Sequence, residues 1–356
     1  MPRLPERVQD APTTAPPTSA NEVAVLIGGK RFRYWSTCSI TRSLDTVDAL
    51  TITAPFAHDT EGFKDMFRPL SFEEIRVTVG GEPLFTGVMV GVSPRVSKEG
   101  KILTVTAYSL PGVLADCTAP ASLFPLEFSG LTLKEIAAKV CEPFGVRVEL
   151  TGDPGAVFER VRLSPTGAVW PWLVKLCTQR GFVMSSTATG ALRIYKPDTP
   201  TTPAAILQQG LSPLTQLSPM INAQTVYSHV TGITPARSGS KGAQYTVQAE
   251  GIGTMRPHTY NLPDTLDADA REAVAGKVRR MYSNAVRYSA LVATWRTTSE
   301  ELWKPGDLVS VDAPDAMIYK PYLLQVRSVV FQRDERQETA SLELTLPDNH
   351  KGLPWD

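Results

Sequence analysis

Two stretches of this sequence, lying far apart along the chain, show the same order of strand-like runs and turns. Each set has three runs rich in β-forming residues; they are residues 75–79, 84–92 and 102–107 in the first set and residues 308–311, 322–331 and 340–346 in the second. A short charged turn separates the second run from the third in both sets. Self-similarity of this kind is typical of a duplicated unit. We therefore predict two β-domains of one plan, with a chance likeness between two β-meanders as the alternative.

The first β-domain is predicted over residues 21–118. Ile75, Val77 and Val79 alternate with polar residues, which is the period of a strand with one buried face. Other β-rich runs in this part end in turn residues; they are residues 23–27, 32–34, 39–40 and 49–53. Short strands punctuated in this way favour a small β-barrel or a sandwich.

Between the two β-domains, over residues 119–203, the apolar period changes to that of helices. Thr132 and Glu135 have the spacing of a capping box ahead of a helix. Residues 168–179 carry apolar side chains along one helical face. A hairpin is expected with its turn at residues 189–190. This part therefore predicts an α/β insert domain.

The second β-domain is predicted over residues 204–347 and contains a helical insertion at residues 264–285. Acidic residues gather in the first turns of that helix and basic residues in its later turns, which suits the helix macrodipole. Residues 1–20 hold five prolines and are expected to form a flexible arm, while residues 348–356 form a tail. The predicted fold class is mainly β with an α+β insert: two similar small β-barrel-like domains separated by an α/β insert domain.

The charge balance bears on possible partners. Lys plus Arg and Asp plus Glu both number 36, whereas binding to nucleic acid or to anionic membranes usually needs a basic excess. No apolar run approaches the roughly 20 residues of a membrane helix, and the N-terminus lacks an apolar signal core. We expect no membrane partner, no direct sequence-specific binding of nucleic acid, and a protein made and kept in the cytosol.

Side chains that could carry chemistry are few and badly spaced. The four cysteines lack a Cys-x-x-Cys spacing and are expected to be buried thiols; they are Cys38, Cys117, Cys141 and Cys177. The four histidines lack the spacing of metal ligands; they are His58, His229, His258 and His350. Two carboxylate pairs are of the kind a glycosidase uses, namely Glu73 with Glu74 and Asp267 with Asp269. The first pair adjoins a strand edge and the second opens a helix, where acids are common. We predict no catalytic site, no cofactor and no bound metal.

Tryptophans are the residues expected to anchor packing or interfaces. Trp170 and Trp303 are interpreted as packing anchors, because a large aromatic side chain in a small core contributes heavily to stability. Trp35 and Trp355 are candidate interface residues, since aromatic side chains are enriched at the centres of protein interfaces.

Three parts of the chain carry, in a fixed order, a set of short motifs. They are residues 35–45, 68–87 and 108–117 in the first part, residues 163–194 in the second, and residues 302–309, with a Trp-x-Pro-Gly turn, in the third. Together these motifs cover most of residues 23–347. Their order and spacing resemble those of the Mu-like hub proteins of contractile phage tails, a family related to the hub portion of type VI secretion spikes.

The resemblance implies a structural protein of the virion tail baseplate, assembled in the host cytoplasm. Hub proteins of this family are homotrimers that sit between the tail tube and the central spike. The implied partners are therefore the tail tube protein, the central spike protein, other baseplate proteins and the tape measure protein in the channel. Two similar β-domains in each of three chains would form a ring of six that matches a sixfold tube. The alternatives are a tail-associated cell-wall hydrolase and a monomeric receptor-binding tail component.

Overall fold

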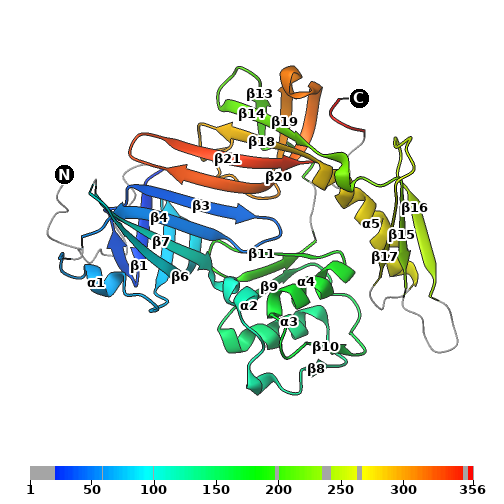
Figure 1. Cartoon of the computed structure of the whole chain (residues 1–356), viewed down its shortest axis with the longest axis horizontal. Coiled ribbons are helices and arrows are strands. Elements are labelled where there is room, and N and C mark those ends of the chain that lie inside the picture. Colours follow the sequence, from blue (N-terminus) through cyan, green and yellow to red (C-terminus); the bar gives the residue numbers. More distant parts are fainter. Residues whose placement is uncertain are drawn as a thin grey trace. The chain divides into compact units, whose positions relative to one another are not determined.

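The computed structural model describes residues 21–57, 59–98, 100–196, 200–234, 242–262, 267–347 and 352–355, with the backbone alone for residues 267–269. The chain divides into two compact units. Unit 1 holds the described residues up to Cys177 together with Phe182–Lys196 and Ser328–Ala340, and unit 2 holds Thr178–Gly181, Pro197–Arg327 and Ser341–Asp356. Figure 1 labels most of the helices and strands along the chain.

An antiparallel sheet forms the first half of unit 1. Its strands are β1 (Val23–Ile27), β2 (Lys30–Phe32), β3 (Thr37–Ser43), β4 (Ala49–Pro55), β5 (Glu74–Val79), β6 (Glu82–Val96) and β7 (Lys101–Ser109), with the short helix α1 (Phe63–Met66) before β5. Paired neighbours follow the order β3-β4-β7-β6-β5-β1-β2. Ile75, Val77 and Val79 are at most 1% exposed. The alternating pattern therefore identifies the buried face of β5 correctly.

The free edge of β3 is covered by a distant part of the chain. Strand β20 (Ile318–Arg333) begins in unit 2 and ends in unit 1. Its last six residues pair antiparallel with β3, from Ser328 opposite Ser43 to Arg333 opposite Cys38. The sheet of unit 1 therefore gains a strand segment that lies 285 residues after β3 in the sequence, counted from Ser43 to Ser328.

The second half of unit 1 is the α/β insert. Its helices are α2 (Val113–Asp116), α3 (Leu133–Cys141) and α4 (Val169–Gln179), and its strands are β8 (Glu127–Phe128), β9 (Val148–Thr151), β10 (Val161–Arg162), β11 (Val183–Ser186) and β12 (Leu192–Tyr195). The capping box at α3 is present, with the Thr132 amide donating to Glu135 Oε2 at 2.8 Å. Helices α3 and α4 share one core, in which Ile136, Val140 and Leu173 are fully buried.

Unit 2 contains a second set of sheet strands and a small helix-covered sheet. The sheet strands are β13 (Ala205–Gln208), β14 (Leu214–Ile221), β18 (Val286–Val292), β19 (Leu308–Ala313), β20 and β21 (Glu338–Thr345); the small sheet consists of β15 (His229–Ile233), β16 (Gln244–Gln248) and β17 (Pro257–Asn261), with helix α5 (Asp267–Ala285). Val230 and Val274 are buried together between this sheet and α5. A Cβ on Gly232 would lie 2.6 Å from Val274 Cγ2, so glycine is needed for the close approach of the helix.

The repeated runs correspond to two three-stranded meanders, β5-β6-β7 and β19-β20-β21. Paired neighbours follow the order β4-β7-β6-β5-β1 in the first set and β18-β21-β20-β19-β13 in the second. The outermost strand differs, because β1 runs antiparallel to β5 whereas β13 runs parallel to β19. The two sets therefore share their strand order and differ in the direction of the outermost strand, and the superposition of the two β-domains stays a prediction.

Several details differ from the sequence predictions. No closed barrel forms in the described residues, since β2 and β14 each have a single paired neighbour there. Closure requires the first and last strands to pair, and β2 is only three residues long. Strands β14 and β17 were missed because Pro219 and Pro257 argue against a strand at these positions. Residues 1–20 and most of the tail lie outside the described residues.

Candidate interaction surfaces

The carboxylates considered for catalysis do not meet as an acid and base pair where they are described. Glu74 lies on β5 and forms an ion pair with Arg76, two residues further along the same strand. The Glu73 carbonyl accepts a hydrogen bond from the Met89 amide at 2.8 Å, which fixes the backbone beside β6. The side chains of Asp267 and Asp269 lie outside the described residues.

The described histidines and cysteines have ordinary structural surroundings. The ring of His258 stacks on Tyr227, with a centroid distance of 4.4 Å, and His229 Nδ1 lies 3.0 Å from the Ser228 hydroxyl. His58 and His350 lie outside the described residues. Burial raises the pKa of three thiols to about 12; they are Cys38, Cys141 and Cys177. Their predicted burial is confirmed, whereas Cys117 is only half-buried. Among the residues that the structure describes, no group of three or more metal-ligating side chains comes together.

The insert is joined to the sheet of unit 1 by specific polar contacts. Thr86 on β6 donates a hydrogen bond to the Ala188 carbonyl at 2.9 Å. Tyr195 on β12 donates to the Leu44 carbonyl at 3.3 Å. Gly190, in the β11-β12 turn, lies so close to this sheet that a Cβ there would be 2.7 Å from Leu110 Cδ1. These contacts fix the insert on the sheet within unit 1, and we call this region the joint.

A buried ion pair lies in the β3-β4 hairpin. Arg42 Nε lies 3.2 Å from Asp48 Oδ2, and the Asp48 side chain is 2% exposed. Burial raises the pKa of Asp48 to about 6, although the Arg42 charge and the hydrogen bond from the Ser43 amide act to lower it. Since burial outweighs its partners, the carboxylate is held here at an energetic cost.

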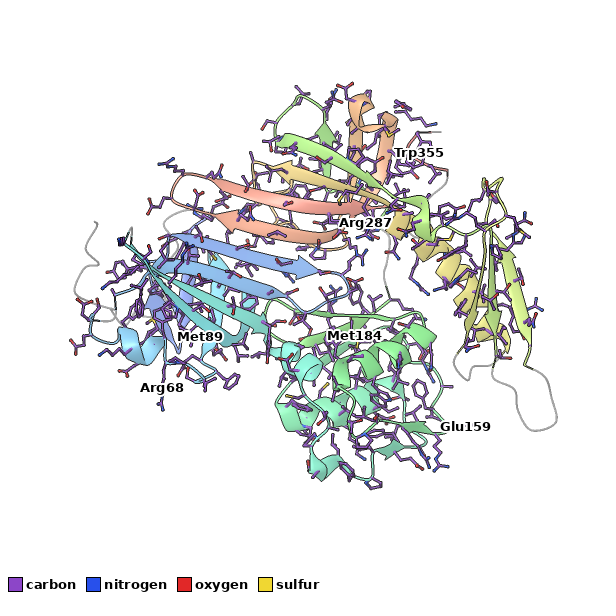
Figure 2. The ribbon with its side chains drawn as sticks, in the orientation of Figure 1. Arg68, Met89, Glu159, Met184, Arg287 and Trp355 are labelled. Atoms are coloured by element: carbon purple, nitrogen blue, oxygen red, sulfur yellow. The ribbon has the colours of Figure 1, made fainter. Side chains whose placement is uncertain are left out.

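The four tryptophans singled out from the sequence occupy different surroundings. Trp303 is fully buried in unit 2, and its Nε1 donates to the Thr294 carbonyl at 3.1 Å. Trp170 packs partly buried against the core of the insert. Trp35 and Trp355 are half-buried, and Trp355 lies on the last described segment (Figure 2).

Among the places where large apolar side chains reach the surface are two that were not predicted from the sequence. Leu70 and Phe72 are 88% and 58% exposed in the loop before β5. Ile206, Tyr319 and Leu323 are 65%, 60% and 42% exposed on β13 and β20. The sequence signal was weak on β13 and β20, because Ile206, Tyr319 and Leu323 each adjoin a buried apolar residue. Among the described residues, no helix is both long enough and apolar enough to cross a membrane.

Comparison with known proteins supports the predicted resemblance. Residues 111–196, which form most of the insert, match the family described as baseplate hub protein gp44-like, second domain. The baseplate hub protein gp44 of Escherichia phage Mu is 26% identical over 333 residues, which cover 89% of this chain and 85% of that protein. The resemblance to Mu-like tail hub proteins is therefore confirmed.

Solved structures share the fold. The 43 kDa tail protein of prophage MuSo2 from Shewanella oneidensis has a TM-score of 0.80 at 23% identity, covering 92% of this chain and 99% of that one. A tail protein from Neisseria meningitidis has a TM-score of 0.78 at 20% identity, covering 92% and 97%. An E. coli component of the type VI secretion system has a TM-score of 0.56 at 12% identity, covering 91% and 76%. The predicted fold class, mainly β with a small insert, is confirmed.

Proposed function

We propose that this chain is a baseplate hub protein of a Mu-like contractile phage tail and is a structural component of the virion. The observation that carries this proposal is the similarity to the phage Mu baseplate hub protein over 89% of the chain. The fold agrees with it, because the tail proteins from Shewanella oneidensis and Neisseria meningitidis share the arrangement over 92% of the chain.

In its finer form, the proposal is a homotrimer that joins the sixfold tail tube to the threefold central spike. Three chains that each contain two similar β-domains offer six comparable modules to the tube. The shared strand order of β5-β6-β7 and β19-β20-β21 supports this arrangement. The partners are then the tube protein, the spike protein, neighbouring baseplate proteins and the tape measure protein in the channel.

The experiment is complementation of a Mu-like phage that lacks its own hub gene. Supplying this chain should restore complete tails, and electron microscopy should place it between the tube and the spike. Tails that form without the chain, or that carry it only at peripheral fibres, would contradict the proposal. The second result would favour the receptor-binding alternative.

The hydrolase alternative has its own test. We expect no release of soluble fragments when the purified chain is incubated with peptidoglycan, because Glu74 is engaged with Arg76 on one strand and the second carboxylate pair opens a helix, where acids are common. A lysozyme sample serves as the positive control. Turnover that disappears in the variants Glu73→Ala, Glu74→Ala, Asp267→Ala or Asp269→Ala would show that the chain is an enzyme.

A further inference from the structure

The loop before β5 holds two apolar side chains outward in an unfavourable backbone conformation. Leu70 and Phe72 have φ values of 63° and 53°, and they are 88% and 58% exposed. Large residues rarely adopt positive φ, because the Cβ approaches the following carbonyl oxygen. Between them, the buried Ser71 hydroxyl has no hydrogen-bond partner among the described residues. Backbone strain of this kind costs about 1 to 3 kcal/mol at each residue and clusters at functional and binding sites.

A surface of different shape lies on the outer side of β13, β19 and β20. Ile206, Ser310 and Leu323 stand side by side across these strands, since Ile206 is opposite Ser310 and Ser310 is opposite Leu323. Ser310 has a smaller side chain than Ile206 and Leu323, so the surface is lower at Ser310 than on either side of it. Tyr319 lies on the same side of β20 by strand alternation. We call these four residues the β13-β20 face.

The inner side of the same strands is already used by the core of unit 2. Residues alternating with Ile206 and Ser310 are at most 3% exposed; they are Ala205, Leu207, Val309 and Val311. The exposed apolar side chains of the β13-β20 face are therefore an additional surface. Strand β13 pairs only with β19 among the described residues, so one border of this face is open.

The two surfaces differ in a way that suits contact with each other. One is a loop with two exposed apolar side chains, and the other is a strand surface on which a small serine lies between two larger side chains, so neither matches a second copy of itself. Their charges also differ: Arg68 is exposed beside Leu70 and projects from unit 1 in Figure 2. Asp312 lies two residues after Ser310 and opposite Gln208, on the same side of β19.

We propose that Leu70 and Phe72 of one copy pack on the β13-β20 face of the next copy, with Arg68 facing Asp312. The contact joins two different surfaces, so it is heterologous and closes only when copies form a ring. The number of copies in that ring, three, rests on the proposed function, whereas the contact itself does not. The binding partner is a second copy of this chain, because one chain carries both the loop with Leu70 and Phe72 and the β13-β20 face.

The test compares association of the full chain with that of surface variants by light scattering after size-exclusion chromatography. Leu70→Asp combined with Phe72→Asp should weaken association at least tenfold, and so should Leu323→Asp. Aspartate tolerates positive φ better than leucine or phenylalanine, so the loop variant should keep its thermal unfolding midpoint. Val157→Asp and Met255→Asp, at sites 52% and 73% exposed, are matched controls and should associate as the wild type does.

Mixing the variants identifies the contact as heterologous. The loop variant keeps an intact β13-β20 face, and the Leu323→Asp variant keeps an intact loop. Their mixture can form one contact per pair and should give a species of two chains, although each variant alone is monomeric. Arg68→Asp alone and Asp312→Arg alone should each weaken association. A chain that carries both changes should associate again, because the two charges are then exchanged.

Two results would overturn the inference: a wild-type chain that stays monomeric at micromolar concentration, or surface variants that associate as the wild type does. Failure of the proposed function is seen separately, in the complementation experiment. If the wild-type chain builds tails and both surface variants do so equally well, the contact is wrong and the hub function stands.

Discussion

Asp48 lies in the β3-β4 hairpin, where burial raises the pKa of its carboxyl from 3.8 to about 6. The folded state then binds this proton more tightly than the unfolded state does. The free energy of unfolding should therefore fall by about 3 kcal/mol at most as the pH rises from about 4 to 6. Above pH 6 it should stay constant. This is the opposite of the usual behaviour of a salt-bridged carboxylate.

The prediction is that Asp48→Asn flattens this part of the pH dependence in urea unfolding followed from pH 4 to 8. Asp45→Asn changes an exposed residue of the same hairpin and is the control. An unchanged slope in the Asp48 variant would show that another group causes the dependence.

The burial of Asp48 could not be predicted from the sequence. An aspartate between a polar turn and a strand is normally solvated. Here the carboxylate loses its water because the hairpin packs within unit 1, where Tyr195 on β12 donates a hydrogen bond to the Leu44 carbonyl of this hairpin. Contacts between residues so far apart leave no local pattern. The apolar alternation at Ile75, Val77 and Val79 does leave one, and it was interpreted correctly.

At the scale of elements, the joint depends on the glycine in the β11-β12 turn. Gly190 has φ 82°, and a Cβ there would lie 2.7 Å from Leu110 Cδ1. Gly130 has φ 68° with open space around it. We expect Gly130→Ala to cost about 1 kcal/mol through its backbone alone. Gly190→Ala should cost about 1 to 3 kcal/mol more, through steric overlap at the joint.

The measurement for this pair is the urea midpoint of each variant under one set of conditions. Limited proteolysis gives a second readout, since a loosened joint should expose the chain between β7 and α3 in the Gly190 variant only. Equal losses of stability in both variants would mean that Leu110 moves aside at little cost.

Helices were predicted more accurately than strands, for a physical reason. Helix α3 carries its start signal in Thr132 and Glu135, and all the hydrogen bonds of a helix are local. Strand β13 has four residues, and its partner β19 begins only at Leu308. The hydrogen bonds that hold β13 as a strand come from β19, about 100 residues further along the chain. The residues next to β13 in the sequence therefore carry no sign of this pairing.

For the whole molecule, the duplicated strand order leads to a prediction about symmetry. Three copies should surround the channel of the assembled tail tip, with the two β-domains of each chain alternating around it. Cryo-electron microscopy of the tail tip measures this directly. Six copies, or one, would show that the duplication does not serve to match a sixfold tube.

Strand β3 is synthesised long before β20, the strand that pairs with its outer edge. Ser43 and its partner Ser328 are separated by 285 residues. At about 5 to 20 residues per second, β3 emerges about 15 to 60 s before its neighbour exists. During that time the nascent chain carries an unpaired strand edge, which is prone to join other chains. Slower synthesis should therefore lower the yield of folded protein, because the edge of β3 stays unpaired for longer.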